Sequence, residues 1–453
     1  MRVAVLVVAL LAAADPTEAQ NVGSLNRTGS GARAAGMANA FIAVSDDGTA
    51  ASWNPAGLAQ LRRPEASIVV DTVARSFDMS GFLTPDNRAR YGDRFTRVTT
   101  SGLDFVSLAV PFDAAGKPVT FQAGWRRLYE LRAEIDADFT REPVSAGGQP
   151  ALRLRQDNNV RGNIDLWSLS AAARLSPRAS LGLSVDLWRG DWSSSELRVQ
   201  QDLSTPQAVF RTRQESNRMS GANVSAGLLL SYARGQVGLV YHAPFESRFD
   251  VSAEGLGPQG SSGVISTGDG TRLAFGHSIG LGGALRPRPR LTLALDFTWD
   301  QWSAAELRGF PGYDGPVSFF DLQPSARTST RDTLSLNLGA EWLLARPGYV
   351  VPLRAGLAYE PQGSMDPILR DPLDFVMVAA GAGFNTNRFK FDAALQYRFG
   401  RQRVSQALTL DGVPLVFPDA YGVQRTGEWR FKVSGILRVT EEGAIGRLLG
   451  KIF

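Results

Sequence analysis

Cysteine is absent from this sequence of 453 residues, and histidine occurs only twice. Without thiols the chain can form neither a disulfide framework nor a Cys–His catalytic pair. His242 and His277 fall in separate expected strands, so they do not indicate a zinc site. No Gly-x-Ser-x-Gly elbow stands on a strand-to-helix turn, although residue types alone leave a serine triad open. We therefore expect no enzymatic activity, no metal and no cofactor.

Long apolar runs and blocks of one charge are also missing. Behind the N-terminal region no stretch stays apolar for the roughly 17 residues that a membrane-spanning helix needs. A role in a membrane therefore requires a closed β-barrel, because only closure pairs every backbone amide and carbonyl of a sheet. The net charge of +4 is spread along the chain, so we expect no nucleic-acid partner.

The N-terminus has the pattern of a secretory signal peptide. Arg2 precedes an apolar run of roughly 11 residues, and small residues lead up to Ala19. This run is too short for a membrane-spanning anchor. We therefore expect residues 1–19 to be a cleaved signal peptide and the protein to be exported.

The rest of the chain shows strong alternation with a period of two. In the stretch 291–302, LTLALDFTWDQW, the leucines share one face with Phe297 and Trp299, whereas Asp296 lies on the other. The stretch 389–399 repeats this pattern. A basic side chain facing lipid at the bilayer midplane costs about 2–4 kcal/mol. The charged residues of such strands should therefore face the lumen of a barrel, as listed here: Asp296, Lys390, Asp392 and Arg398.

Strand length and connection length both favour a transmembrane barrel over a soluble sandwich. The alternating runs are longer than the usual five or six residues, and several carry aromatics near one end, as an interfacial girdle does. Those aromatics are Trp188, Trp192, Trp299, Trp302, Tyr397 and Phe399. The candidate strands are fourteen: 65–82, 96–112, 118–139, 151–176, 179–201, 210–233, 236–254, 271–286, 290–308, 329–345, 350–360, 373–386, 388–409 and 421–439. Their connections alternate between long and short, which places both barrel ends on the periplasmic side.

Residues 29–61, GSGARAAGMANAFIAVSDDGTAASWNPAGLAQL, are too apolar for a linker and too rich in Gly and Ala for an ordinary core. They resemble the N-terminal hatch of the FadL/TodX family of outer-membrane transporters for long-chain fatty acids and aromatic hydrocarbons. The resemblance rests on GARA at 31–34, AFIAV at 40–44, Asp46-Asp47 and NPAG at 54–57. Barrel stretches at 237–249, 293–303 and 353–362 also look like recurring phrases of that family.

The resemblance implies an all-β fold, a transmembrane antiparallel barrel of about 14 strands with the hatch inside its lumen. The expected order is signal peptide 1–19, hatch 20–62, barrel 63–440 and C-terminal tail 441–453. Small residues let a hatch approach the wall closely, and the Asn54 amide can bridge hatch and wall or simply belong to a turn. The residues expected to hold or gate the hatch are Gly36, Phe41, Asp46, Asp47, Trp53, Asn54, Pro55 and Ala56.

The same resemblance implies a side opening at a kink in the third strand. Gly124 is the bulge candidate there, although a glycine packing against an aromatic ring is the alternative. The long outer connections are apolar and are candidates for ligand access or for packing on each other, with Phe310, Phe319, Phe320 and Phe417 as the residues concerned. A carboxylate head group could meet one of four basic residues, Arg126, Arg354, Lys390 or Arg398.

The function implied by the resemblance is passive uptake of hydrophobic or amphipathic small molecules, with access through outer loops, apolar lumenal pockets and a hatch-gated lateral exit. A related barrel that serves as a secretion or assembly scaffold is the alternative. An aqueous porin is a further alternative, which an obstructing hatch disfavours. The expected location is the bacterial outer membrane, as a monomer in contact with outer-membrane lipid and lipopolysaccharide.

Overall fold

The structure is a computed structural model, and it describes residues 26–80, 94–114, 116–141, 152–203, 208–256, 262–266, 270–310, 314–318, 330–366, 369–410 and 413–439. The expected signal peptide and C-terminal tail lie outside these residues. The short helices are α3 (Ala32–Gly36), η1 (Ala50–Ser52), η2 (Pro55–Gln60) and η4 (Trp302–Ala304). In the part of the chain that is described, no helix has the length and hydropathy needed to cross a bilayer.

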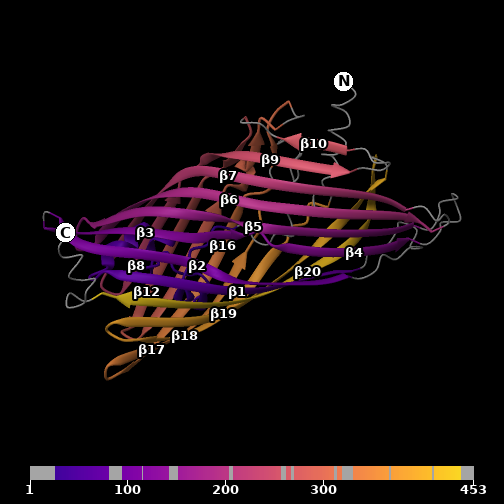
Figure 1. Ribbon diagram of the computed structural model, residues 1–453. Helices are drawn as coiled ribbons and strands as arrows, with labels where there is room; N and C mark the ends of the chain where they lie inside the picture. Colours follow the sequence, from indigo (N-terminus) through magenta and orange to yellow (C-terminus); the bar gives the residue numbers. More distant parts are fainter. Residues whose placement is uncertain are drawn as a thin grey trace.

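Strands make up nearly all the rest. They are β1 (Glu65–Ser80), β2 (Arg94–Ala114), β3 (Lys117–Glu130), β4 (Ala133–Arg141), β5 (Leu152–Arg174), β6 (Ala179–Asp202), β7 (Ala208–Ser231), β8 (Gly235–His242), β9 (Phe245–Leu256), β10 (Ser262–Ser266), β11 (Arg272–Phe275), β12 (Ser278–Arg288), β13 (Leu291–Asp300), β14 (Glu306–Arg308), β15 (Val317–Ser318), β16 (Thr333–Arg346), β17 (Tyr349–Glu360), β18 (Asp374–Asn385), β19 (Phe389–Leu410) and β20 (Val413–Arg438). β1 pairs antiparallel with both β2 and β20, which closes the sheet into a barrel (Figure 1).

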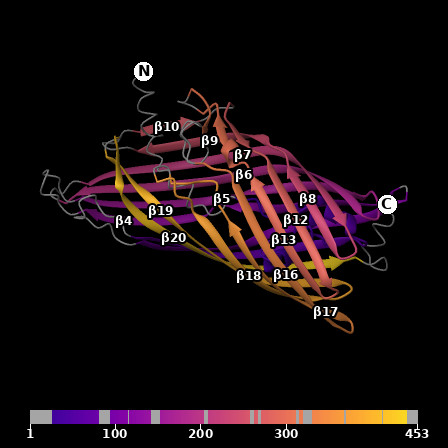
Figure 2. The ribbon, with the colours of Figure 1, turned by 180° about the vertical axis from the view of Figure 1, so that it is seen from behind.

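Some wall strands consist of two consecutive segments, namely β3–β4, β8–β9, β11–β12 and β13–β14. Both segments of such a pair hydrogen-bond to the same neighbouring wall strand, as β8 and β9 do with β7. Among the described residues the short strands β10 and β15 pair only with β9 and β14, so they are not counted as wall strands. The closed antiparallel barrel then has 14 strands, which confirms the predicted barrel. Figure 2 shows the interrupted strands β8, β12 and β13 on the side opposite to β5 and β6.

The connections differ in length at the two ends of the barrel. Only a few residues join β5 to β6, β7 to β8 and β16 to β17, and these turns lie at one end, called here the short-turn end. The last strand finishes at this end, because Arg438 pairs with Glu65 at the start of β1. One predicted long connection, 410–421, is wrong: β19 and β20 stay paired up to Leu410 and Val413. Extending the ladder there satisfies backbone groups that a loop leaves to water.

Alternation sorts the side chains as the sequence predicts. Outward positions near the short-turn end form an apolar belt, in which Leu169 and Leu183 are 68% and 59% exposed. The four charged residues expected in the lumen, Asp296, Lys390, Asp392 and Arg398, are all buried, which confirms their inward orientation. The predicted aromatic girdle is wrong at three positions, because Trp188 and Trp302 are buried and Trp192 packs on a buried apolar cluster.

Polarity reverses toward the other end of the barrel. Along β6 the outward side chains change from Leu187 to the exposed Arg189, while the inward ones change from Asp186 to Trp188. The wall above this level, formed by β4, the distal parts of β5–β7, β9, β11 and β14, is called the upper wall. It has a polar outer face and an apolar inner face, as a water-soluble sheet has. The reversal explains why those tryptophans turn inward.

Candidate lumenal site and lateral seam

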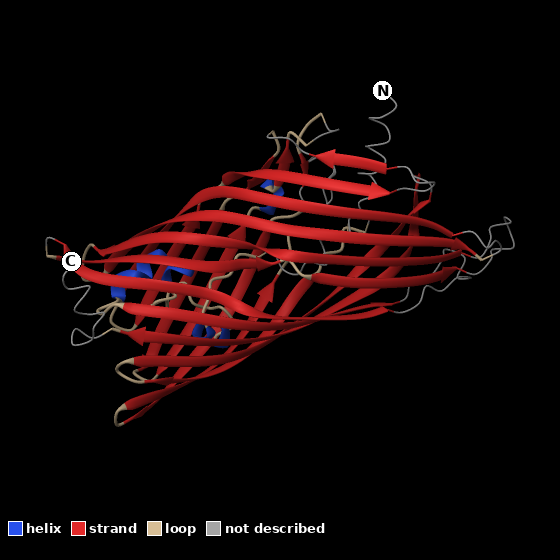
Figure 3. Cartoon of the chain, viewed as in Figure 1, coloured by secondary structure: helices blue, strands red, loops and turns tan. Residues whose placement is uncertain are grey.

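The N-terminal segment, residues 26–63, packs against inward-facing side chains near the short-turn end. Its helices α3, η1 and η2 lie within the ring of strands, near the end where β20 finishes (Figure 3). Phe41, Met37 and Leu58 are fully buried there. Trp53 stacks edge-on to Phe41, with ring centroids 5.9 Å apart, and its indole nitrogen donates to the Ser30 carbonyl at 2.7 Å.

Asn54 joins three backbone stretches. Its backbone is extended, and its side-chain oxygen accepts from the Ala56 amide at 3.1 Å, so that it caps η2 with Pro55 as the first helical residue. Its Nδ2 donates to the carbonyls of Ile42 and of Leu228 on β7, each at 3.2 Å. Because the side chain is completely buried, water cannot replace the hydrogen bonds that it makes to these backbone groups.

Glycines in the wall allow the segment to touch the backbone of the barrel. The Cα of Gly381 on β18 faces Gly36 so closely that a methyl group on Gly36 would lie 3.0 Å from it. A methyl group on Gly282 of β12 would lie 2.7 Å from the Cβ of Ile42. These separations are shorter than ordinary contacts, so the fit depends on the missing Cβ atoms.

Polar groups of the wall satisfy the backbone of the segment. Asp296 Oδ2 accepts from the amides of Phe41 and Ile42 at 2.6 and 2.7 Å. Asn337 donates to the Ala38 carbonyl at 2.8 Å, and Gln396 to the Ala35 carbonyl at 3.0 Å. Side chains from strands far apart in the barrel thus hold one irregular stretch of chain.

An ionic cluster joins α3 to β16 of the barrel wall. Arg33 makes a bidentate pair with Glu341 of β16, with both N–O distances 3.0 Å, and also pairs with Asp46 and Asp47. Burial disfavours the charged guanidinium, but Asp46 and Glu341 outweigh it and raise the pKa of Arg33 well above its ordinary value. Burial alone would raise the pKa of Asp47, yet Lys390, Arg33 and hydrogen bonds from Thr49 hold it below its ordinary value. Both groups stay charged at neutral pH.

A cluster of buried aromatic side chains lines the lumen of the upper wall. Trp188 lies 4.8 Å from Phe245 and 5.4 Å from Phe275, measured between ring centroids. Arg27 of the N-terminal segment extends toward it, with its guanidinium carbon 5.4 Å from the Trp188 ring. Phe310 belongs to the same buried cluster. The expected access residue Phe310 follows β14 and is buried in this cluster, so its side chain is not exposed on an outer loop.

The remaining expected access residues cannot be placed in the same way. Phe319 and Phe320 lie outside the described residues. Phe417 belongs to β20 instead of a loop, and its side chain lies outside the described part.

The third wall strand is interrupted, but not at Gly124. Gly124 stays in regular register between Ser107 of β2 and Ser168 of β5, so the predicted bulge there is wrong. The register shifts instead between Arg127 and Tyr129, and β4 begins only at Ala133. A glycine fits a regular ladder between two strands well. The irregular residues, from Arg127 to Tyr129, lie instead at the level where the wall changes polarity.

This interruption opens a seam in the barrel wall. The β2–β3 ladder runs from Ala114–Lys117 to Phe105–Arg126, and within the described residues no ladder joins the remainder of β2 to β4. The side chains of Thr100 and Glu130 bridge the seam with a 3.0 Å hydrogen bond. At this level the described backbone of β2 is paired with β1 and that of β4 with β5, but the facing edges of β2 and β4 are not paired with each other.

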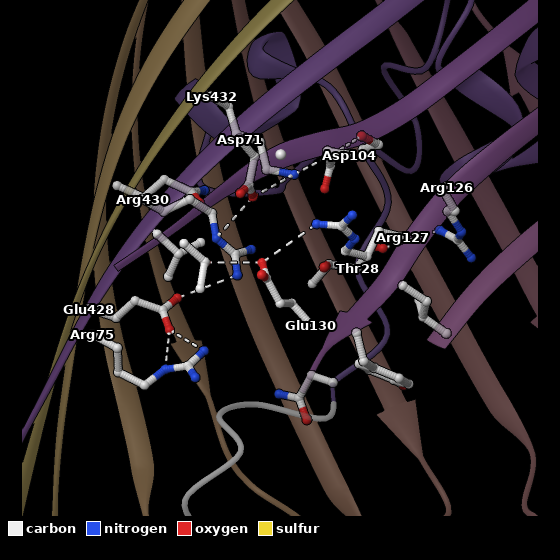
Figure 4. A pocket seen from close by; sticks show the side chains of 18 of the residues that line it. Thr28, Asp71, Arg75, Asp104, Arg126, Arg127, Glu130, Glu428, Arg430 and Lys432 are labelled. Carbon is white, nitrogen blue, oxygen red and sulfur yellow. Dashed lines mark hydrogen bonds and ion pairs between the residues drawn. The ribbon is translucent and has the colours of Figure 1, made fainter. Parts of the chain in front are cut away.

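A pocket adjoins the seam and is lined by charged side chains of β1, β2, β3 and β20 (Figure 4). Lys432 lies 2.8 Å from Asp104, and Arg75 lies 2.8 Å from Glu428. Arg126 instead donates to the carbonyls of Thr28 and Ser52 in the N-terminal segment, each at 3.2 Å.

Of the four basic residues proposed for a carboxylate head group, the other three are engaged by acids. Arg354 pairs with Glu341 and Asp392, Lys390 with Glu65, and Arg398 with Glu360 and Glu428. Sequence alternation indicated that these residues face inward. Which acid each one pairs with depends on the register between strands, which alternation does not give. Within the described residues, no group of three or more His, Cys, Asp or Glu side chains is placed to hold a metal ion.

A family described as "Outer membrane protein transport protein (OMPP1/FadL/TodX)" matches residues 7–412. The chain belongs to this OMPP1/FadL/TodX family. It is therefore an outer-membrane transport protein with a β-barrel fold. No curated protein matches the chain in sequence.

Solved structures of FadL/TodX type share its fold. A Pseudomonas aeruginosa FadL homologue has a TM-score of 0.64 at 15% identity, covering 92% of this chain and 99% of that chain. The P. putida toluene transporter TodX has a TM-score of 0.57 at 15% identity, covering 91% and 99%. The Ralstonia pickettii toluene transporter TbuX has a TM-score of 0.55 at 14% identity, covering 92% and 100%. At these identities the likeness shows the fold.

Proposed function

We propose that this family member carries long-chain fatty acids or aromatic hydrocarbons passively across the outer membrane, with no chemical step. The observation that carries the proposal is the buried aromatic cluster around Trp188, which gives the lumen an apolar surface above the N-terminal segment. A water-filled channel for polar solutes is lined by polar side chains instead. Toluene is named as the ligand of the similar transporters TodX and TbuX, and fatty acids are the other ligand class that the family resemblance implies.

The path runs from the long-connection end to the side of the barrel. A ligand contacts the aromatic cluster first, then passes the N-terminal segment, which serves as the hatch (residues 20–62), and leaves between β2 and β4. The charged pocket at the seam suits the head group of an amphipathic ligand, and Arg126 is the basic side chain there that donates to the hatch backbone. Release of Arg126 by a ligand carboxylate would loosen the hatch.

The remaining features of the proposal concern export and surroundings. Residues 1–19 act as a cleaved signal peptide, the mature barrel is a monomer, and its outer face contacts lipid and lipopolysaccharide. The hatch residues Gly36, Phe41, Asp46, Asp47, Trp53, Asn54, Pro55 and Ala56 hold the closed state through the contacts given above.

Uptake by cells that lack their own transporter tests the proposal. We expect cells expressing the chain to take up radiolabelled oleate or toluene, and Trp188→Ala to reduce that uptake several-fold because it removes the centre of the aromatic cluster. Trp167→Ala is the matched control, since this tryptophan lies on the neighbouring strand but is 57% exposed on the outer face. A folded barrel, verified by heat-modifiable gel mobility, that takes up neither compound would overturn the proposal.

A further inference from the structure

The outer face of β5, β6, β7 and β9 changes its chemistry from level to level. Each level is one row of register partners across these strands. The uppermost apolar level contains Trp167, Leu187 and Ala222, which pair in sequence across β5, β6 and β7. All three are outward, and Leu187 is 47% exposed. This row marks the upper edge of the apolar belt.

The next two levels are rich in arginine. The first contains Arg189, paired through Ser220 with Arg248, and the second contains Arg218. All three arginines are exposed, Arg218 with 75% of its side chain accessible. Acidic residues share these levels, with Asp191 and Asp250 opposite Arg218, and Asp165 opposite Arg189. Such exposed pairs are weak and salt-sensitive, so an external anion can compete for the guanidinium groups.

Above the arginines the outer face consists mainly of small hydroxyl and amide side chains. One level holds Ser193, Ser216 and Ser252 beside Arg161, and the next holds Asn159, Ser195, Gln214 and Glu254. These groups line a shallow polar groove. Hydroxyl and amide groups donate and accept hydrogen bonds without a fixed charge, which suits neutral sugar hydroxyls.

The strands that carry these levels are much longer than those elsewhere in the wall. β6 and β7 contain 24 residues each, whereas β17 and β18 contain 12. Crossing the hydrocarbon takes about 9–11 tilted residues, so more than half of each long strand stands beyond it. Figure 1 shows β5, β6 and β7 reaching past the shorter strands. Successive outward residues rise about 7 Å, so the levels extend over tens of ångströms.

We propose that this face binds a phosphorylated glycolipid of the outer leaflet, of the lipopolysaccharide class. Its acyl chains lie on the apolar belt, its phosphates on Arg189, Arg218 and Arg248, and its sugars on the hydroxyl and amide levels. A glycerophospholipid fits less well, because its head group ends at the arginine levels and leaves those above without a partner. The inference rests on the contact with lipopolysaccharide in the proposed function and gives that contact a defined site through the order of the levels, and it is independent of transport.

Native mass spectrometry of the delipidated barrel tests the inference with defined probes. The probes are bisphosphorylated lipid A, lipid A bearing core sugars, dephosphorylated lipid A and phosphatidylglycerol. We expect the core-bearing form to bind best, and removal of the phosphates to weaken binding at least about tenfold because charge-assisted hydrogen bonds are lost. The double variant Arg189→Glu/Arg248→Glu should lose bisphosphorylated lipid A to a similar extent.

The matched control is Arg288→Glu/Arg346→Glu, which makes the same charge change at exposed positions of the short-turn end. It should bind every probe as the unaltered chain does. Equal binding by the two double variants, or phosphatidylglycerol binding as tightly as core-bearing lipid A, would overturn the inference. Hydrophobic-ligand uptake is measured in parallel. The glycolipid face points away from the lumen. Loss of glycolipid binding and loss of hydrophobic-ligand uptake are therefore measured as separate results.

Discussion

At the scale of single residues, the presence or absence of one side-chain atom decides how closely the N-terminal segment, the proposed hatch, packs against the barrel wall. Gly282 and Gly283 are neighbours on β12, but one faces the hatch and the other faces outward. An added Cβ on Gly282 meets Ile42 and the Asp296 carboxylate, whereas on Gly283 its nearest neighbour is the Leu295 carbonyl at 3.9 Å. The same chemical change therefore has different consequences at adjacent positions.

We predict that Gly282→Ala displaces the hatch and that Gly283→Ala does not. The methyl group at 282 overlaps atoms of the hatch backbone, and overpacking of this kind costs about 1–3 kcal/mol. Limited proteolysis of the purified barrel measures hatch release, and bilayer conductance measures any leak. Equal protection of both variants would show that the hatch is not held by this contact.

A second residue-scale prediction concerns Asp47 and acid. Because the pKa of Asp47 is lowered in the folded protein, its carboxylate stabilises the hatch at neutral pH. This contribution is complete above the ordinary Asp pKa of about 3.9 and disappears as the pH falls through the lowered value. Arg33 and Lys390 face this carboxylate, and their attraction favours its charged form.

We therefore expect pepsin to release the hatch of the unaltered chain more readily between about pH 4 and pH 2. In the Asp47→Asn variant the hatch should already be held less firmly at pH 5, and acidification should increase its release by pepsin less than in the unaltered chain. If the variant followed the same acid profile as the unaltered chain, other carboxylates would account for the effect.

At the scale of strands, the interruption of β3–β4 matters more than any single glycine. Among the described residues no ladder joins β2 to β4, whereas the neighbouring β1–β2 ladder runs from Glu65 to Met79 with one register shift after Val69. Two adjacent pairs of strands thus differ in one property, the continuity of their hydrogen bonds. That difference makes a direct comparison possible, and the absence of native cysteine removes background labelling.

We predict that fixing the seam closed reduces uptake. A short bis-maleimide linker joining cysteines at Thr100 and Glu130 should prevent β2 from separating from the end of β3, where the seam begins, since these two side chains already touch. The same linker at Thr72 and Ser101, whose hydroxyl oxygens lie 2.9 Å apart on the paired strands β1 and β2, should leave uptake unchanged. Undiminished uptake through the linked seam would place the exit elsewhere.

At the scale of the whole molecule, a single reversal of polarity fixes its position in the membrane. On β6, Leu183 lies in the apolar belt, and Ser195 lies on the exposed upper wall of the same strand and the same face. Continuous strands of the barrel thus place apolar side chains against lipid and polar side chains in water. Its inner surface follows the opposite order.

We expect Leu183→Arg to destabilise folding into bilayers by about 2–4 kcal/mol near the midplane, because it places a cation in hydrocarbon. Ser195→Arg adds the same side chain above the belt and should change the free energy of folding by less than about 0.5 kcal/mol. Denaturant titration of vesicle-inserted protein measures both. Similar losses for the two variants would contradict the assigned boundary.

The sequence by itself determined the barrel, most strand boundaries and the inward orientation of Asp296, Lys390, Asp392 and Arg398. These features follow from a local signal, the period-two alternation that one buried and one lipid-facing surface impose on every strand. The Gly- and Ala-rich N-terminal motif was also local. Gly124 failed as a bulge because glycine only permits irregular backbone and does not require it.

Only the tertiary structure decided which groups meet. The pairing of Arg33 with Glu341, the approach of Gly282 to Ile42 and the break beside Tyr129 all depend on register between strands distant in sequence. Alternation tells which face a residue occupies, but not which residue lies opposite. The inward turn of Trp188 was missed for a related reason: alternation looks the same on both sides of the level where polarity reverses, and only the assembled wall shows where that level lies.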